Sequence, residues 1–379
     1  MTGKRHRSSV FQKNREDLPA ATPANSWERK ARSLGLNPHS TVYAIGFNPV
    51  WRKYVRQFFQ DARVQFVADA SRIPKGHIAV IWGRKHAAGL HHSCILLRIE
   101  DGFLRSVGLG MQFARPLSWV IDSRGLYFDA TGPSDIEYLL NHRDFSPQQL
   151  SRAQSLQEKI CASRISKYNT PGQRWQKPEH PRVILIAGQV ETDASITYGA
   201  TDIRTNLELV QAVKANNPDA WLVYKPHPDV VAGTRAPGKH EQEIQRYCHT
   251  VAPAASLADM LEQCDEVHVN TSLTGFEALL RNKPVTCYGL PFYAGWGLTE
   301  DKASNGRRQR SRSLNELIAA TLIEYPLYVS RNTGQYATPE TILDELKEWR
   351  DQPPTTGQRF RAHFGKATRN LATLVTGKK

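Results

Sequence analysis

The sequence predicts an α/β protein made of two domains whose parallel sheets face one cleft. The chain has 379 residues, about twice the usual length of a domain. Short runs rich in β-branched residues alternate with helical stretches, and a polar, proline-bounded segment over residues 171–182 interrupts this alternation once. Ligands of parallel sheets gather at the carboxyl ends of the strands, so chemistry is expected in the residues that follow each run.

In the first half of the chain, strands and helices are expected in close succession. The predicted strands are 41–47, 64–67, 78–82, 94–99 and 118–121, and the predicted helices are 50–60, one that begins near Ser134, and 147–167. A further apolar run at 125–128 is separated from the run at 118–121 by Asp122-Ser123-Arg124, which is typical of a β-hairpin.

The alternation restarts after the segment 171–182. The predicted strands are 183–187, 220–224, 266–269 and 285–288, and the predicted helices between them are 203–215, 257–263 and 276–281. We therefore divide the chain into a basic disordered leader (1–38), an N-terminal α/β domain (39–170), a linker (171–182), a C-terminal α/β domain (183–330), a C-terminal helix (331–354) and a basic tail (355–379).

The composition excludes several classes of protein. Hydrophobic residues make up 40% of the chain and charged residues 23%, so it is neither collagen-like nor wholly disordered. No apolar run reaches the roughly 18 to 20 residues needed to cross a bilayer, and the basic N-terminus is not followed by the apolar segment of a signal peptide. The five cysteines are scattered, so reduced thiols in the cytoplasm are expected rather than disulfides or a zinc site.

Positive charge is concentrated at the two ends. The net charge is +14; residues 1–35 hold eight basic and three acidic residues, residues 355–379 hold six basic and no acidic ones, and the body between them is left with +3. The near balance of the body argues against a nucleic-acid-binding surface there, and no nucleic-acid-binding motif accompanies the charge.

The C-terminal stretch has the pattern of a basic amphipathic helix. Phe360, Phe364, Leu371 and Leu374 recur at helical spacing among lysines and arginines. An anionic membrane surface is the favoured partner of this tail. A helix packed on the body is the alternative, and nucleic acid is the least favoured of the three.

Acidic residues follow one strand in each half of the chain. Glu100 and Asp101, with Arg105 close behind, come after the strand 94–99, and Asp193 comes after the strand 183–187. Two carboxyl groups on either side of a reacting carbon can act as acid/base and nucleophile. The alternative is that these residues only form ion pairs or cap helices.

Phosphate-binding chemistry is expected after two strands of the second half. Lys225 and His227 lie in a proline-flanked loop, and both can donate hydrogen bonds to a phosphate. Thr271 and Ser272, followed by Gly275, stand at a predicted helix start, and Glu277 can accept from ribose hydroxyls. Helix capping by the hydroxyl groups is an equal alternative.

The dinucleotide and P-loop fingerprints are absent. The residues alone thus predict a two-domain α/β enzyme that acts on a phosphorylated, nucleotide-linked substrate.

Eight motifs of the chain belong together: Trp82-Gly83-Arg84, Glu100–Gly110, Pro116-Leu117-Ser118, Ser166-Lys167-Tyr168-Asn169, Gly188-Gln189-Val190 with Asp193-Ala194-Ser195, Lys225-Pro226-His227-Pro228-Asp229, Thr271-Ser272 with Gly275–Leu280, and Tyr288–Thr299. Taken together, they resemble those of the capsule polysaccharide β-Kdo transferases of the KpsC type, where Kdo is an acidic sugar. They occur in order between about residues 40 and 330. The resemblance is closest to the second catalytic module of the two-module enzymes, and because one module is present, one type of linkage is expected.

The resemblance implies a fold, a donor and a reaction. The fold is a GT-B-like pair of Rossmann-like domains, with an acceptor-side domain at 39–170 and a nucleotide-sugar domain at 183–330. The donor is CMP-β-Kdo, and Kdo is transferred with retention to a Kdo-terminated lipid-linked acceptor in capsule synthesis. The partners implied are therefore a nucleotide sugar, a glycolipid acceptor, the inner membrane at which the cytoplasmic protein is peripheral, and capsule biosynthesis or export proteins.

The resemblance also implies roles at the first carboxylate cluster and at Asp193. Asp193 matches the nucleophile and Glu100 the acid/base. Asp101 and Arg105 either orient Glu100 or bind the Kdo carboxylate.

Further implied roles concern the CMP moiety. Lys225 and His227 hold the phosphate, Thr271 and Ser272 assist in the motif that contains Gly275, and Glu277 binds the ribose. Further substrate contacts are assigned to Gln189, Ser195, Tyr293 and Trp296, the last two in a run that either walls the cleft near the cytosine or is simply a packed loop. No cofactor or metal is expected, because these groups can offset the charge of one phosphate.

Two alternatives stay open at the level of function. One is a GT-B transferase with a different nucleotide sugar, and the other is an inactive scaffold of a capsule assembly complex. The arginine-rich run 307–312 is expected to be a solvated loop, with binding of an acidic glycan or lipid headgroup as the alternative.

Overall fold

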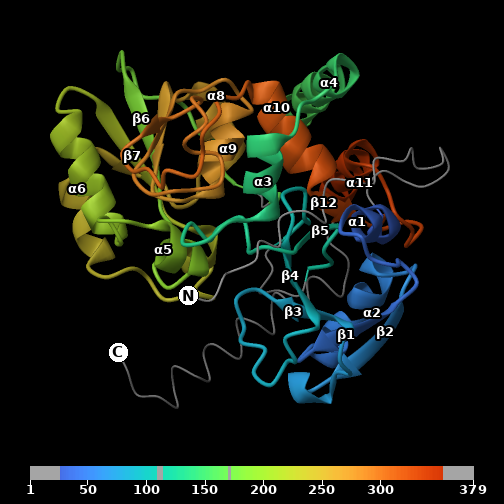
Figure 1. Cartoon of the computed structure of the whole chain (residues 1–379). Helices are drawn as coiled ribbons and strands as arrows, with labels where there is room; N and C mark the ends of the chain where they lie inside the picture. The colour runs from blue at the N-terminus through green and yellow to red at the C-terminus, as the bar shows by residue number, and fades with distance from the viewer. Residues whose placement is uncertain (1–25, 109–113, 170–171, 353–379) are drawn as a thin grey trace.

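The computed structural model describes residues 26–108, 114–169 and 172–352. These residues form two α/β domains, each built on a six-stranded sheet, with the second domain on the left of Figure 1 and the first on the right. The predicted fold class is confirmed. The predicted tail 355–379 and most of the predicted leader lie outside the described residues.

The first sheet has the strand order β12-β5-β4-β3-β1-β2. Its strands are β1 (Thr41–Ile45), β2 (Arg63–Val67), β3 (Ile78–Trp82), β4 (Ile95–Asp101), β5 (Ser118–Asp122) and β12 (Pro326–Tyr328). The first four are parallel, whereas β5 runs antiparallel to β4 and β12 antiparallel to β5. The sheet is thus mostly, not wholly, parallel.

The second sheet has the order β11-β10-β9-β6-β7-β8, and all its described pairings are parallel. Its strands are β6 (Val183–Ala187), β7 (Trp221–Lys225), β8 (Thr250–Val251), β9 (Glu266–Val269), β10 (Val285–Cys287) and β11 (Glu300–Asp301). All five residues of β6 are buried, as expected for a central parallel strand covered on both faces.

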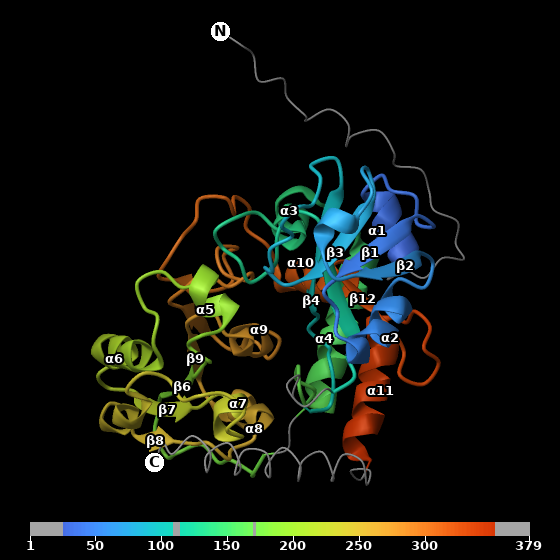
Figure 2. The same ribbon diagram turned by 90° about the horizontal axis from the view of Figure 1, so that it is seen from below.

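Helices cover the sheets. The first domain carries α1 (Trp27–Ser33), α2 (Pro49–Phe58), η1 (Ala70–Arg72), α3 (Asp135–His142), α4 (Pro147–Ser163), α10 (Leu314–Ile318), the π-helical turn η4 (Ala319–Glu324) and α11 (Pro339–Asp351). The second carries α5 (Ala194–Gly199), α6 (Asn206–Asn216), α7 (Pro228–Val231), η3 (Glu241–Arg246), α8 (Leu257–Gln263) and α9 (Leu273–Leu279). Helices α4 and α11 pack on each other (Figure 2).

Helix starts follow from the local sequence. Ser146 and Gln149 form a capping box at the start of α4, where Pro147 occupies the first turn. Thr205 and Glu208 form the same reciprocal pair at α6. In both cases, polar side chains satisfy backbone N–H groups that have no partner within the helix.

The chain returns to the first domain after it has completed the second. Strand β12 pairs with β5, although its residues fall inside the predicted C-terminal domain 183–330. The strand has only three residues and begins with a proline, so it offers almost no periodic signal in the sequence. The first domain is therefore assembled from two separate parts of the chain.

Two further expectations for the first domain are wrong. Within the predicted disordered leader, residues 27–33 form α1, because Trp27 is fully buried and its indole N–H donates to the carbonyl of Pro38 at 2.8 Å. Residues 125–128 form no strand. Instead, Asp122 accepts hydrogen bonds from the backbone N–H groups of Arg124 and Gly125, each at 2.8 Å, and turns the chain away from the sheet.

The arginine-rich run 307–312 holds the two domains together instead of forming a solvated loop. Arg307 pairs with Glu137 of α3 at 2.7 Å, and Arg308 pairs with the same carboxylate at 3.3 Å. Arg308 also donates to the carbonyls of Pro291 and Ala294 in the second domain, at 2.5 and 2.6 Å. Since its side chain is only 6% exposed, it is an internal group and not a ligand for a glycan or headgroup.

One hydrophobic core extends across the domain boundary. Phe103, which follows β4, is 3% exposed, and its ring centroid lies 4.9 Å from that of Phe292 and 6.1 Å from that of Phe276. These aromatic contacts fix the two domains against each other beside the functional cavity.

Candidate active site

A large cavity lies between the domains at the carboxyl ends of their strands. Its volume is about 1390 Å³. On one side it is lined by residues that end or follow β1, β3 and β4, and on the other by residues that follow β6, β7 and β9. Cavities at this edge of parallel sheets are the usual place of a ligand site.

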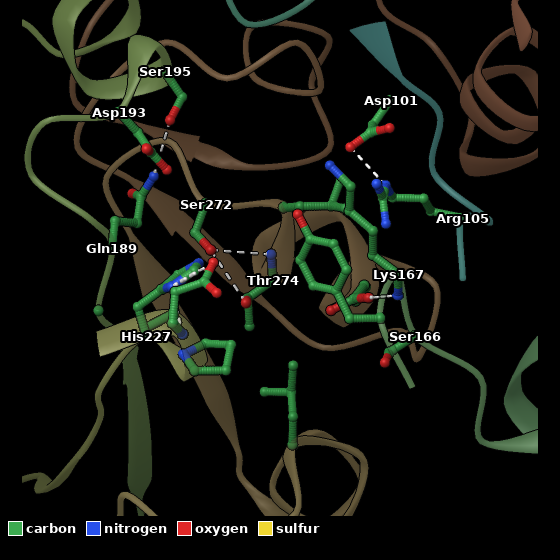
Figure 3. Close-up of a pocket in the computed structure, with 18 of the residues that line it drawn as sticks. Asp101, Arg105, Ser166, Lys167, Gln189, Asp193, Ser195, His227, Ser272 and Thr274 are labelled. Atoms are coloured by element: carbon green, nitrogen blue, oxygen red, sulfur yellow. Dashed lines mark hydrogen bonds and ion pairs between the residues drawn. The ribbon is translucent and has the colours of Figure 1, made fainter. Parts of the chain in front are cut away.

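The cavity brings together most of the residues that the sequence singled out. Those that line it are Glu100, Asp101, Arg105, Gln189, Asp193, Ser195, Lys225, His227, Thr271, Ser272 and Glu277. In Figure 3, Asp193 and Ser195 lie across the cavity from Asp101 and Arg105. Carboxylates from both domains therefore face one space.

The first-domain carboxylates differ in their surroundings. Glu100 is partly buried and accepts a hydrogen bond from the backbone N–H of Asp101 at 3.0 Å. Burial, together with the neighbouring charge of Asp101, raises the pKa of Glu100 to about 7. A carboxyl group with such a pKa can exchange a proton near neutral pH.

Arg105 forms an ion pair with Asp101. Its Nε lies 2.6 Å from Oδ2 of Asp101, its Nη1 donates to Ser106 Oγ at 2.8 Å, and its side chain is 2% exposed. The other carboxylate oxygen of Asp101, Oδ1, is buried and has no hydrogen-bond partner among the described residues. This ion pair therefore fixes the end of β4 next to Glu100, and Oδ1 of Asp101 is left without a donor among the described residues.

Lys167 lines the cavity on the same side as Arg105 and provides a cation there (Figure 3). Burial disfavours its charged form, but Tyr127, Tyr168, Asp101 and Glu100 more than offset this and raise the pKa of Lys167. Within the described part of the chain, its ammonium group makes no ion pair within 4.0 Å. A charged, unpaired lysine beside two carboxylates is suited to bind an anionic group of a substrate.

Asp193 stands at the N-terminal end of α5, but its side chain makes no capping hydrogen bond. Instead, its Oδ1 pairs with Nη2 of Arg235 at 2.7 Å, and its side chain is 39% exposed. The carboxylate is thus oriented from one side and open to the cavity on the other. Helix capping does not explain this residue.

Gln189 and Thr271 tie two strand ends together. The Gln189 carboxamide accepts from the backbone N–H of Thr271 at 2.9 Å and donates to its hydroxyl at 3.0 Å. The same amide nitrogen lies 3.5 Å from Ser195 Oγ. These contacts position the floor of the cavity between β6 and β9.

Lys225 and His227 extend into the cavity from the loop after β7. Burial lowers the pKa of Lys225 to about 8, and its ammonium donates to the carbonyl of Pro253 at 2.8 Å. Burial also lowers the pKa of His227, and its Nδ1 accepts from the backbone N–H of Asp229 at 3.1 Å. The neutral imidazole must then carry its proton on Nε2, the nitrogen left to a ligand.

Ser272 and Glu277 lie at the start and in the body of α9. Ser272 Oγ accepts from the backbone N–H of Thr274 at 3.2 Å, so its hydroxyl caps the helix. Glu277 accepts from the backbone N–H of Lys167 at 2.9 Å, and burial raises its pKa. Glu277 therefore joins the two domains, with its carboxyl group at the cavity.

Three predicted residues do not line the cavity: Gly275, Tyr293 and Trp296. Tyr293 and Trp296 are fully buried; the tyrosine hydroxyl donates to the carbonyl of Ser272 and the indole N–H to that of Phe292. Gly275 has no room for a side chain because the Tyr293 ring packs on it. The run is a packed loop that supports the start of α9 from behind.

Sequence reasoning assigned no role to two cations of the cavity, Lys167 and Arg235. Lys167 belongs to a quoted motif, Ser166-Lys167-Tyr168-Asn169, which was a usable signal. Arg235 lies in the loop after α7, and its contact with Asp193 arises only when the chain folds, so the local sequence gives no signal for it.

Among the described residues, no group of three or more His, Cys, Asp and Glu side chains is arranged to hold a metal ion. Likewise, no helix within 26–108, 114–169 or 172–352 combines the length and apolarity that crossing a membrane requires.

The architecture is that of a GT-B-like protein, in which two Rossmann-like domains share a ligand cavity. The chain belongs to the family of capsule polysaccharide biosynthesis proteins, whose sequence pattern it matches over residues 77–328.

The relatives agree with this family. The chain is 40% identical over 346 residues to the capsule polysaccharide modification protein LipA of Neisseria meningitidis serogroup B, covering 88% of this chain and 49% of LipA. It is 37% identical over 325 residues to the lipopolysaccharide-processing protein LpsZ of Rhizobium meliloti, covering 80% of this chain and 74% of LpsZ. The chain thus spans about half the length of LipA.

Solved structures with the same fold include two of KpsC from Thermosulfurimonas dismutans. The β-Kdo 2,7-transferase matches with a TM-score of 0.69 at 36% identity, covering 82% of this chain and 100% of that one. The β-Kdo 2,4-transferase matches with a TM-score of 0.70 at 32% identity, covering 82% and 98%.

Proposed function

We propose that this protein is a retaining β-Kdo glycosyltransferase that moves Kdo from CMP-β-Kdo to a Kdo-terminated, lipid-linked acceptor in capsule synthesis. The observation that carries the proposal is the pair Glu100 and Asp193, which reach one cavity from different domains. Likeness to two Kdo transferases of known structure supports the choice of sugar.

In the proposed first step, Asp193 attacks the anomeric carbon of the donor sugar. The bond from that carbon to the phosphate oxygen breaks, and CMP leaves with the electron pair. Arg235 favours this step because it holds the carboxylate of Asp193 in one orientation.

In the second step, an acceptor hydroxyl attacks the same carbon from the side that CMP has left. The bond to Asp193 breaks, and Glu100 takes the proton of the hydroxyl. Two inversions give net retention. The raised pKa of Glu100 suits this exchange because a base near neutral pH can both accept and release the proton.

The CMP phosphate is proposed to bind between Lys225 and His227. Lysine supplies a positive charge and the imidazole Nε2–H a hydrogen bond. Glu277 accepts from the ribose, and Gln189, Thr271, Ser272 and Ser195 complete the floor. The reaction then needs no metal ion, since one phosphate charge is offset by these groups.

The first test combines purified protein, CMP-Kdo generated in place and a synthetic Kdo-terminated acceptor, with mass spectrometry as readout. Wild type is expected to add one Kdo, and Asp193→Asn none. Asp219→Asn, an exposed substitution in the same domain that does not line the cavity, is the matched control and should behave as wild type. The proposed donor is wrong if wild type turns over only a different nucleotide sugar, and the proposed nucleophile is wrong if Asp193→Asn still transfers.

A further inference from the structure

Two tryptophans form a wall of the cavity that the chemistry above does not use. Trp51 lies in α2 and Trp82 ends β3, and both line the cavity. Their ring centroids are 6.4 Å apart and their planes are inclined by 30°. Each ring packs partly on the first-domain core and is only partly buried, so part of its surface is left to the cavity.

The wall is rigid. Trp82 packs edge-on against the buried Trp119 at 5.4 Å, and Trp119 stacks on Phe58 at 4.4 Å. Trp51 also contacts Tyr54 of its own helix at 5.7 Å. Aromatic rings held in this way offer a preformed apolar surface, so a ligand that stacks on them does not have to order them first.

The wall adjoins the proposed acid/base. In the parallel pair β3–β4, Trp82 is the register partner of Ile99, the residue before Glu100. A Cβ atom on Gly83 would lie 3.6 Å from Oε2 of Glu100, so the chain passes close to this carboxylate directly after Trp82. A sugar on the tryptophans therefore has its hydroxyl groups beside the group that must take a proton.

Polar groups border the wall. Lys85 lines the cavity, and its ammonium group makes no hydrogen bond or ion pair with any residue in the described ranges. Asn48 also lines the cavity, and its side-chain oxygen accepts from the backbone N–H of Val50 at 3.1 Å at the start of α2. An apolar platform with a cation at its border matches a pyranose ring that carries a carboxylate.

We propose that Trp51, Trp82 and Lys85 form the subsite that binds the terminal acidic sugar of the acceptor. One face of the ring stacks on the tryptophans, and its carboxylate pairs with Lys85. The donor sugar lies on the other side of Glu100, toward Asp193. This inference rests on the proposed function, because it assigns the acceptor of that same reaction.

The test measures acceptor binding with the donor absent, by titration of a Kdo-terminated disaccharide. Wild type is expected to bind, and Trp51→Leu and Lys85→Met each to bind about tenfold more weakly. The matched controls are Trp221→Leu and Lys75→Met, which do not line the cavity and should bind as wild type. Affinity for CMP should be the same in all five proteins, which excludes a general loss of structure.

The outcomes separate this inference from the proposed function. If wild type binds the disaccharide, the two subsite variants bind it about tenfold more weakly, and CMP-Kdo is not a donor, then the subsite is supported and the proposed donor is wrong. If wild type transfers Kdo but the subsite variants keep its acceptor affinity and acceptor KM, then the subsite is wrong and the function stands. Failure of wild type to bind the disaccharide overturns the subsite.

Discussion

Arg235 holds Asp193 from the side of the second domain, with Nη2 of the arginine 2.7 Å from Oδ1 of the carboxylate. The same nitrogen donates to Thr192 Oγ1 at 3.1 Å, so the guanidinium is itself fixed. Because the Asp193 side chain makes no capping hydrogen bond at the start of α5, the contact with Arg235 fixes its orientation.

Replacing Arg235 should therefore slow the chemical step. We expect Arg235→Gln to lower kcat on the order of tenfold to a hundredfold, because a misoriented nucleophile reaches the reacting carbon less often. The affinity for CMP should change little. Arg246→Gln is the control, since that side chain is 73% exposed and does not line the cavity. An unchanged kcat in Arg235→Gln would mean that Asp193 needs no such restraint.

The pH dependence of transfer should report on Glu100. With its pKa raised to about 7, Glu100 is protonated below neutral pH, so transfer is expected to rise as the pH increases through about 7. Lys167 favours the charged form of Glu100. Lys167→Met should thus move the midpoint of kcat/KM to higher pH, whereas the exposed Lys159→Met should leave it in place. The same midpoint in both variants would mean that Lys167 does not influence the ionisation of Glu100.

Binding of CMP should depend on pH through Lys225. Burial lowers the pKa of Lys225 to about 8, so the free protein loses this charge as the pH rises through about 8. We expect titration calorimetry to show weaker CMP binding at pH 9 than at pH 7. Lys225→Arg keeps its charge and should remove most of this dependence. Lys302→Arg, outside the cavity, should behave as wild type, and a similar decline in both variants would argue against a phosphate contact by Lys225.

The basic tail 355–379 is proposed to bind an anionic membrane surface. Deleting it should abolish sedimentation of the protein with vesicles that contain anionic lipid at physiological salt, because the tail carries six of the basic residues and no acidic ones. Transfer to a short, soluble acceptor should be unaffected. Equal sedimentation of the full and shortened chains would place membrane binding elsewhere.

The strands and most of the cavity could be predicted because both depend on local pattern. The apolar run of β6 has the bounds expected for a buried parallel strand, and Glu100 and Asp193 follow strand ends as site residues commonly do. From the sequence alone, Tyr293 and Trp296 could be expected to line the cavity. Whether a side chain is buried depends on its packing against residues that are distant in the chain, and these two side chains face the core.

The missed features depend on contacts between distant parts of the chain. Arg235 acquires its role only through Asp193, and Arg308 through Glu137 of the other domain. A run of arginines looks the same in sequence whether it is solvated or internal, since the difference is the presence of partners across the fold.

The return of β12 to the first sheet determines the order in which the protein can assemble during synthesis. A nascent chain complete to residue 301 contains all six strands of the second sheet but only five of the first, and β5 still has an open edge. The second domain can therefore close on the ribosome while the first waits for its last strand. A chain that ends before residue 326 would still contain Glu100 and Asp193. It would lack β12, the strand that completes the sheet carrying Glu100.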